Sequence, residues 1–490
     1  MTFFQAMENP CSAALLSVDP AGSEPLYRQL YGRIRGAITE GVLKPGDRIP
    51  SARALAKELG LARGTIEMAY GLLSAEGYIQ SRGQAGTIVT PGIHMSSATA
   101  RPTQRAPTQF VEVATAFGGS HPDDPDPSRE IPPFQMGLPA LDAFPRKIWA
   151  RLGARQLRGT QPPDMNYPSL FGLPALRQAI AAYLLVARGI SCSTEQVFIT
   201  SGYRDTMQFI MQTLLTPGDR VWMEDPGYLP TRELLERAGL HPVHVPVDAE
   251  GMVVRQGIAL ASAARAAVVT PAHQSPLSMS LSLPRRLDIL DWAAQAGAWI
   301  VEDDYDGEYR YASRPLPALT SLDRRGRVLY AGTFSKVMFP GIRLAYLVVP
   351  ENEVLRFRET RQVFAPGIPS LTQKMVAAFM AEGHFGRHIQ RMRKLYAERR
   401  DATATGLMRV LGGHMQVAPQ PGGMHLLLRM RESRSDEVLA ARMREHGMYA
   451  HALSNWAVST SVEPGLLLSF TNIATQERAE ELGRRILDLI

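Results

Sequence analysis

Cysteine is scarce in this sequence: Cys11 and Cys192 are the only two among 490 residues. Two cysteines in unrelated contexts cannot build a disulfide framework or a metal cluster, so we expect no metal site and a reducing, cytoplasmic environment. Runs of ~18 consecutive apolar residues are also absent, which argues against a transmembrane helix. The first basic residue is Arg28, so the charged start of a signal peptide is missing and we expect no membrane partner.

Net charge is small overall but unevenly distributed. The chain has 53 Lys and Arg against 47 Asp and Glu, or +6. Residues 25–90 hold nine basic and five acidic residues, so nine minus five places +4 of that charge in about an eighth of the sequence. A small basic domain is the electrostatic pattern of a phosphate-binding module, although the charge alone fits a solvated basic surface equally well.

The texture of the sequence divides the chain into four parts. A tail, residues 1–24, precedes the basic module at 25–90, and residues 91–131 are a linker rich in Pro, Ser, Thr, Ala and Gly. From 132 to 490, short apolar β-rich runs alternate with helical stretches. This alternation predicts an α/β domain with a mostly parallel buried sheet, followed by a smaller α+β part at the C-terminus.

The stretch PSARALAKELGLARGTIEMAYGLLSAEGYI predicts a helix, a turn and a second helix. Helical spacing places four side chains of the second helix in a core: Ile66, Ala69, Tyr70 and Leu73. Arg63, Gly64, Thr65 and Met68 then face outward near the helix start, a suitable arrangement for entering a major groove. Two short strands around a glycine-rich turn follow and form a wing that carries Arg82. A generic three-helix interaction module is the alternative.

The segment from PLYRQLYGRIRG to the EGYI motif resembles the winged-helix domain of the GntR family, with GVLKPGDRIPSARALA as the main signature. The resemblance implies that operator DNA is the partner. It also implies DNA contacts from Arg53, from the start of the recognition helix at Arg63, Gly64 and Thr65, and from Arg82 in the wing. Ala62 and Gly64 depart from the family, where hydroxylated or amide residues are common.

In the C-terminal part, YAGTFSKVMFPGIRLAYLVVP is the most informative segment. A strand delivers Thr333, Ser335 and Lys336 into a loop, and Arg343 follows seven residues after the lysine. A lysine in this setting can form a Schiff base with an aldehyde, and the hydroxyls and the guanidinium can hold a phosphate. A surface lysine would be the simpler interpretation if this segment stood alone.

Three further segments place polar groups at strand ends. WIVEDDYDGEY presents Asp303, which could keep a pyridine nitrogen protonated, and Tyr305, which could hydrogen-bond a phenolate oxygen. FITSGYRD opens a helix at residue 203, whose exposed amides could bind phosphate. MEDPGY presents Tyr228 as a platform for stacking on a ring.

Together these segments resemble the fold-type-I aminotransferases, which use pyridoxal 5′-phosphate (PLP), over residues 134–490. The resemblance implies that Lys336 forms the internal aldimine with PLP and that sites lie at a dimer interface. The implied cofactor-binding residues are Tyr203, Arg204, Tyr228, Ser275, Asp303, Tyr305, Thr333, Ser335, Lys336 and Arg343, with Tyr167 reaching the phosphate of the partner subunit's site.

Two departures from the aminotransferases bear on activity. Ser275 precedes Pro276 in TPAHQSPLSM, where an Asn-Pro pair is usual, and the His273-Gln274 pair there is typical of a regulator subgroup. Leu467 stands where the family has the arginine that binds a substrate carboxylate. Arg232 is a possible substitute, although a solvated helix residue is the simpler interpretation.

A winged helix joined by a long linker to an aminotransferase-like domain is similar to the MocR/GabR-type subgroup of GntR regulators. The resemblance implies a PLP-dependent transcriptional regulator that senses an amine or amino-acid effector through aldimine exchange at Lys336, with at most residual transaminase activity. It also implies a homodimer, domain-swapped head to tail, on two DNA half-sites. The alternatives are an active aminotransferase with a DNA-binding domain, a sensor of PLP that controls vitamin B6 synthesis, and a cofactor-free scaffold.

Overall fold

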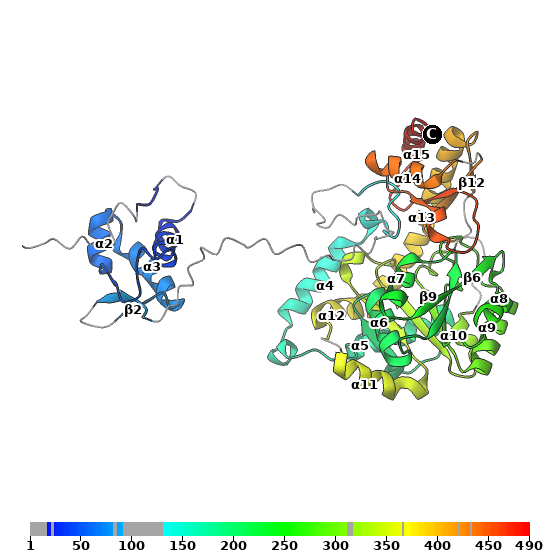
Figure 1. Cartoon of the computed structure of the whole chain (residues 1–490), viewed down its shortest axis with the longest axis horizontal. Coiled ribbons are helices and arrows are strands. Elements are labelled where there is room, and N and C mark those ends of the chain that lie inside the picture. The colour runs from blue at the N-terminus through cyan, green and yellow to red at the C-terminus, as the bar shows by residue number, and fades with distance from the viewer. Residues whose placement is uncertain are drawn as a thin grey trace, which may run out of the picture. The chain divides into compact units, whose positions relative to one another are not determined.

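The computed structural model describes residues 17–20, 24–81, 86–91, 131–310, 317–364, 367–418, 422–431 and 434–490. The chain divides into two compact units, residues 1–125 and 126–490 (Figure 1). Within the described ranges, no helix has the length and apolar character needed to cross a bilayer. Most of the predicted linker, residues 92–130, lies outside them.

The N-terminal unit is a winged helix. Ser51 caps the second helix by accepting the Ala54 N–H, and the left-handed Gly60 (φ 65°) ends it, which produces the predicted turn. The predicted core positions of the third helix are buried and its first residues face solvent, as expected. The elements are α1 (Leu26–Thr39), β1 (Arg48–Ile49), α2 (Ala52–Leu59), α3 (Arg63–Ala75), β2 (Ile79–Ser81) and β3 (Thr87–Val89). The strands pair antiparallel in the order β1-β3-β2, and β1 is a strand that the sequence did not predict.

The second unit is built on an eight-stranded mixed sheet, so the predicted α/β class is confirmed. β11 pairs antiparallel with both of its neighbours and β7 pairs antiparallel with β6, while the strands from β10 through β6 run parallel. In sheet order the strands are β4 (Val197–Thr200), β11 (Ala345–Val348), β10 (Val328–Thr333), β9 (Trp299–Asp304), β8 (Ala266–Val269), β5 (Arg220–Asp225), β6 (His241–Asp248) and β7 (Gly251–Met252).

Helices cover this sheet, which explains why its strands are continuous apolar runs in the sequence (Figure 1). All six residues of β9 are buried, including its three acidic residues. The helices are α4 (Arg146–Arg158), α5 (Pro174–Arg188), α6 (Tyr203–Leu214), α7 (Leu229–Arg237), α8 (Val254–Ala261), α9 (Leu283–Ala296), α10 (Leu319–Leu322), α11 (Val354–Phe364), α12 (Ser370–Ala381) and α13 (His384–Leu411).

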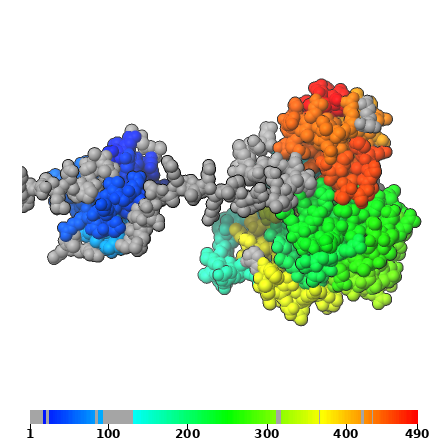
Figure 2. Space-filling model, in the orientation of Figure 1, coloured from blue at the N-terminus to red at the C-terminus, as the bar shows by residue number. Residues whose placement is uncertain are grey.

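The C-terminal part is the predicted smaller α+β layer. An antiparallel sheet with the order β12-β13-β15-β14 is accompanied by helices, and α13 packs along the last helix. Its elements are β12 (Met415–Ala418), β13 (His425–Met430), α14 (Asp436–Glu445), β14 (His451–Ala452), β15 (Gly465–Ser469) and α15 (Gln476–Leu487). Figure 2 shows these residues, in orange and red, gathered at one side of the green residues of the large sheet.

Candidate functional site

The candidate site lies where the parallel strands of the large sheet end. β9 pairs in parallel with β10 and β8, and β8 pairs in parallel with β5. Because parallel strands end at the same edge, the end of β9 and the loops after the strands carry Asp303, Tyr305, Lys336 and Tyr228 into one region. Burial raises the pKa of both Tyr228 and Tyr305, and the negative charge of Asp303 adds to each shift, which is consistent with this proximity.

The three acidic side chains at the end of β9 point to alternating faces of the sheet, because successive residues of a strand do so. Glu302 accepts hydrogen bonds from the Leu319 N–H at 2.8 Å and from the Thr320 hydroxyl at 2.6 Å. Asp304, two residues later on the same face, forms a buried ion pair with Arg188. Both carboxylates therefore hold neighbouring elements in place, and Asp303 on the opposite face is left for the site.

Asp303 is a buried carboxyl group with an unusual titration. It is 7% exposed, and burial raises its pKa well above the ordinary value, with further contributions from Asp304, Glu224 and Asp306. A cationic partner at this place would relieve that cost. A protonated pyridine nitrogen is such a partner, so Asp303 could bind one end of PLP.

Lys336 lies in the loop after β10, half-buried. Its Nζ donates a hydrogen bond to the Gly137 carbonyl oxygen at 2.7 Å. A Cβ atom at Gly137 would stand 2.5 Å from this Nζ, so the close approach requires glycine. Burial lowers the lysine pKa, opposed by Asp306 and Asp303. A lysine with a lowered pKa is neutral more often and is therefore a better nucleophile for an aldehyde.

An anion cradle lies between the start of α6 and Arg343. The N-cap of α6 is Gly202 (φ 125°), and no side chain caps this helix. A Cβ at Gly202 would stand 3.0 Å from an Arg343 guanidinium nitrogen, and Arg343 itself is left-handed at φ 50°. The Thr333 hydroxyl accepts the Ser335 N–H at 3.1 Å at the edge of this cradle. Helix amides and a guanidinium that converge in this way could hold a phosphate.

Aromatic side chains stand beside the predicted ring position. Tyr228, at the N-cap of α7, is 37% exposed, and its ring lies 5.7 Å from Tyr203 and 6.0 Å from Trp456. The Tyr203 hydroxyl is 2.6 Å from the Thr231 hydroxyl, so the Tyr203 side chain is fixed in addition to the backbone role that the sequence suggested. Trp456 was not predicted, because it follows β14 in a distant segment.

Tyr305, the residue predicted to meet the phenolic oxygen of PLP, contacts His273. Its hydroxyl lies 3.0 Å from His273 Nδ1. Ser275 is buried, and its N–H donates to the Thr270 hydroxyl at 3.1 Å. In the sequence His273 is only a residue typical of a regulator subgroup, and no pattern points to Asp306, whose carboxylate lies 3.2 Å from the same nitrogen.

Some predicted residues are not brought to this site within the chain. Tyr167 is 95% exposed. The Arg204 side chain faces solvent, while its backbone amide, the group predicted to meet the phosphate, lies in the first turn of α6. Leu467 is fully buried on β15, opposite Leu427 of β13, so no carboxylate-binding group stands there. Arg232 Nε lies 4.0 Å from Glu236, one helical turn away.

In the winged helix, the predicted DNA-contacting residues lie around the start of α3. Arg53 and Gly64 are exposed and Thr65 is half-buried, while Arg63 pairs with Glu67 at 2.8 Å on the surface. α3 has no side-chain cap, so its first amides are free of a capping side chain and could meet a phosphate. Arg82 lies outside the described residues.

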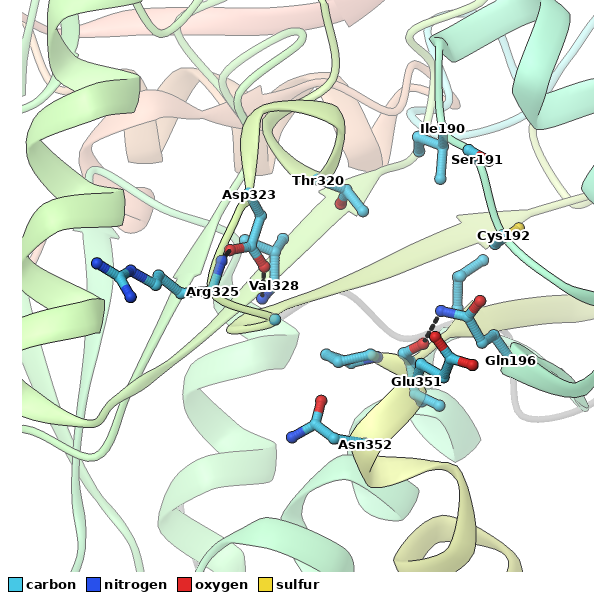
Figure 3. A pocket seen from close by; sticks show the side chains of 14 residues that line it. Ile190, Ser191, Cys192, Gln196, Thr320, Asp323, Arg325, Val328, Glu351 and Asn352 are labelled. Atoms are coloured by element: carbon cyan, nitrogen blue, oxygen red, sulfur yellow. Dashed lines mark hydrogen bonds between the residues drawn. The ribbon is translucent and has the colours of Figure 1, made fainter.

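A cavity of about 570 Å³ lies at the opposite edge of the large sheet, near Val328, the first residue of β10 (Figure 3). Asp323 in its wall accepts hydrogen bonds from the backbone N–H groups of Arg325 and Val328. Cys192 is also in the wall, and burial raises the pKa of its thiol to about 11. An engaged carboxylate and an unreactive thiol provide none of the chemistry of the candidate site.

Several characterised and uncharacterised regulators are similar to nearly the whole chain. The probable rhizopine catabolism regulatory protein MocR of Rhizobium meliloti is 36% identical over 96% of this chain and 94% of its own. The pyridoxine biosynthesis transcriptional regulator PdxR of Corynebacterium glutamicum is 30% identical over 93% and 94%. The transcriptional regulator TauR of Rhodobacter capsulatus is 34% identical over 86% and 88%.

Solved aminotransferase structures match the second unit. The kynurenine aminotransferase of Pyrococcus horikoshii has a TM-score of 0.66 at 24% identity, over 74% of this chain and 92% of that chain. LysN, the α-aminoadipate aminotransferase of Thermus thermophilus, has a TM-score of 0.65 at 27% identity, over 73% and 92%. Two family profiles divide the sequence: bacterial regulatory proteins of the gntR family at residues 26–89, and aminotransferase class I and II at residues 140–477. The chain therefore belongs to the MocR-type subgroup of gntR-family transcriptional regulators, in which a winged helix precedes a PLP-dependent type of aminotransferase domain.

Proposed function

We propose that this protein regulates transcription by binding PLP at Lys336 and an amine or amino-acid effector at the same site. The observation that carries the proposal is the meeting of three groups at one sheet edge: a half-buried lysine, a buried carboxyl with a raised pKa, and an uncapped helix start facing a guanidinium. When bound, PLP supplies an aldehyde carbon that primary amines attack. Each end of that cofactor meets a group of suitable charge.

Different residues of the chain would bind different parts of the cofactor. Arg343 and the first amides of α6 would hold the phosphate, and Asp303 would keep the pyridine nitrogen protonated. Tyr228 would pack on the ring, and Tyr305 would donate to the phenolic oxygen. Lys336, whose pKa burial lowers, would provide the amine that holds the cofactor. An effector amine would take the place of this lysine.

A regulatory role is favoured over catalysis by the position of Leu467. Its side chain is fully buried in the sheet of the C-terminal part, where an arginine would be needed to hold a substrate carboxylate. Without that group, a bound amino acid is poorly oriented for proton transfer. We therefore expect at most residual transaminase activity.

The proposed assembly is a homodimer whose sites share Tyr167. Met165 and Tyr167 are 80% and 95% exposed, and Val363 and Phe364, at the end of α11, are 76% and 61% exposed. Exposed apolar side chains of this size favour burial by a second copy of the chain. Two winged helices per dimer, each docked on the other subunit's large domain, would then read two half-sites of operator DNA.

The test is to load the purified protein with PLP, reduce it with borohydride, and identify the modified residue by mass spectrometry. A stable adduct on Lys336, absent from Lys336→Ala, is expected. Operator binding of the loaded dimer is then measured by fluorescence anisotropy with a panel of amines, and at least one amine should change the affinity. No adduct, or an adduct at another lysine, would overturn the proposal.

A PLP sensor is the second candidate, because the relative PdxR is named for pyridoxine biosynthesis. In that case PLP alone changes operator affinity, and no amine has a further effect. The same anisotropy experiment, carried out with and without PLP before any amine is added, separates the two functions.

A further inference from the structure

A buried polar cluster joins the loop after β8 to the loop after β9. His273 Nδ1 lies 3.0 Å from the Tyr305 hydroxyl and 3.2 Å from Asp306 Oδ1. His273 is 5% exposed and Asp306 is 1% exposed. One ring nitrogen of a buried histidine therefore faces both a hydroxyl and a buried carboxylate.

Asp306 is poorly compensated for a buried acid. Among the described residues, neither of its carboxylate oxygens has a hydrogen-bond partner that meets normal geometry, and His273 Nε2 has none either. A buried carboxylate in this situation is costly and acts mainly through its charge on the nearest polar groups. One of these is His273 Nδ1, and the same charge also opposes the lowering of the Lys336 pKa by burial and adds to the raised pKa of Tyr305.

The carboxylate decides which nitrogen of His273 carries hydrogen. A bare Nδ1 could accept the Tyr305 proton, but its lone pair would also face the Asp306 carboxylate at 3.2 Å. A hydrogen on Nδ1 replaces that repulsion with attraction, and the 3.0 Å separation from the Tyr305 oxygen is a hydrogen-bond distance. The Tyr305 oxygen then accepts from His273, so its own proton is free to be donated elsewhere.

We propose that Asp306 fixes His273 in the Nδ1–H form, and that His273 thereby reserves the Tyr305 hydroxyl proton for the phenolic oxygen of bound PLP. His273 and Asp306 are positioning residues, since they act through Tyr305. This inference rests on the proposed function, because it requires PLP at Lys336. It gives a physical role to His273, which in the sequence is only typical of a regulator subgroup.

The surroundings hold the His273 ring in place. A Cβ at Gly423 would stand 1.9 Å from the ring, so the chain passes against the ring and prevents it from tilting in that direction. The ring of His425 lies 5.7 Å away, and burial lowers its pKa to about 4, which keeps it neutral.

The other groups that act on Tyr305 are the acids Asp303 and Glu224 and the side chain of Ser275, which also hydrogen-bonds to it. The carboxylates can only accept hydrogen bonds when ionised, and a serine hydroxyl can rotate to accept or donate. A histidine fixed in the Nδ1–H form is therefore the member of this group that always donates to the Tyr305 oxygen.

The test is an absorbance titration of the PLP-loaded protein against pH, with variants at Tyr305, His273 and Asp306. Tyr305→Phe removes the donor and should move the spectral midpoint upward, because the phenolate loses the hydrogen bond that stabilises it. The shift should be about one to two pH units, the tenfold to hundredfold change expected for a hydrogen bond to a charged oxygen. His273→Phe should move the midpoint in the same direction, and the double variant Tyr305→Phe/His273→Phe should move it no further than Tyr305→Phe alone. Asp306→Asn also removes a charge that opposes the lowering of the Lys336 pKa by burial, so it is tested as a cycle: adding Tyr305→Phe to Asp306→Asn should shift the midpoint less than Tyr305→Phe shifts that of the unmodified protein.

His425→Gln is the matched control, since this buried neutral neighbour bonds the Pro276 carbonyl and not Tyr305. Its midpoint should equal that of the unmodified protein. Additive shifts in either double variant, or an unchanged midpoint in His273→Phe, would overturn the inference while leaving PLP binding intact. An unmodified protein that binds no PLP would instead refute the proposed function.

If a variant does not fold, a neutron crystal structure of the unmodified, PLP-loaded protein tests the inference, because it shows which nitrogen of His273 carries hydrogen. Deuterium on His273 Nδ1 and a Tyr305 hydroxyl directed at the cofactor are expected. Deuterium on Nε2 alone, with the Tyr305 hydroxyl directed at His273, would reject the arrangement.

Discussion

Replacing Gly202 with alanine tests the anion cradle most directly. Gly202 has φ 125° and ψ 175°, a conformation that is essentially restricted to glycine. The added Cβ would also stand 3.0 Å from an Arg343 guanidinium nitrogen. The substitution therefore acts on both partners that we assign to the phosphate of PLP, namely the start of α6 and Arg343.

The magnitude follows from these two effects. Holding alanine in this backbone conformation costs about 1–3 kcal/mol of stability. The Arg343 guanidinium must also shift by a few tenths of an ångström. That shift weakens its hydrogen bonds to a charged phosphate, and such bonds contribute about 1.5–3 kcal/mol. At about 1.36 kcal/mol per factor of ten, the affinity for PLP should fall roughly tenfold to hundredfold.

The assay is a titration of the apo protein with PLP, followed by absorbance, together with urea unfolding of each variant. Gly218→Ala is the matched control: Gly218 also has a positive φ, 95°, but a Cβ there meets nothing within 4 Å. Both variants should lose stability, and only Gly202→Ala should lose PLP affinity. If Gly202→Ala binds PLP within about threefold of the unmodified protein, on the scale of the hydrogen-bond energies above, the phosphate does not lie in this cradle.

Three further predictions concern the lysine, the DNA face and acid stability. Lys336→Ala should abolish the borohydride-fixed PLP adduct with an unchanged far-UV circular dichroism spectrum, whereas an adduct that persists would exclude this lysine. Arg53→Ala and Arg63→Ala should each weaken operator binding and, for a phosphate contact, reduce the slope of log affinity against log salt by about one; unchanged binding of both would refute the groove placement. Burial lowers the pKa of His388 to about 4, so the folded protein binds this proton less readily than the unfolded chain. The neutral, buried His388 therefore contributes to the free energy of unfolding above pH 6.5, and this contribution is lost as the pH falls toward 4. In urea unfolding, the unmodified protein should lose about 2–3 kcal/mol more than His388→Gln between pH 7 and pH 4.5. An equal loss in the two proteins would contradict the assignment.

The sequence by itself was enough to predict the two domain types and the main reactive residues. Arg63, Ile66 and their neighbours lie within one helix, so helical spacing alone separates the exposed from the buried side. Lys336 and Asp303 each follow a recognisable buried strand, and parallel strands end at a common edge. The family membership and the α/β class are confirmed, whereas the roles of the individual site residues stay predictions.

Only the tertiary structure decided which polar groups remain available at the site. Glu302, Asp303 and Asp304 form one acidic run in the sequence, yet Thr320 engages the first and Arg188 the last, while Asp303 lies beside Tyr203 at the site. These partners come from segments far away in the sequence, as does Gly137, which lies 199 residues before the lysine that it contacts.

The contacts around Tyr305 likewise join segments that are distant in the sequence. His273 and Asp306 meet because β8 and β9 are neighbours in the sheet, and no local pattern in the sequence encodes that adjacency. Local spacing determines which face of a helix or strand a side chain occupies. The partner it meets there, and hence its charge and hydrogen-bonding state, depends on the order in which the strands assemble.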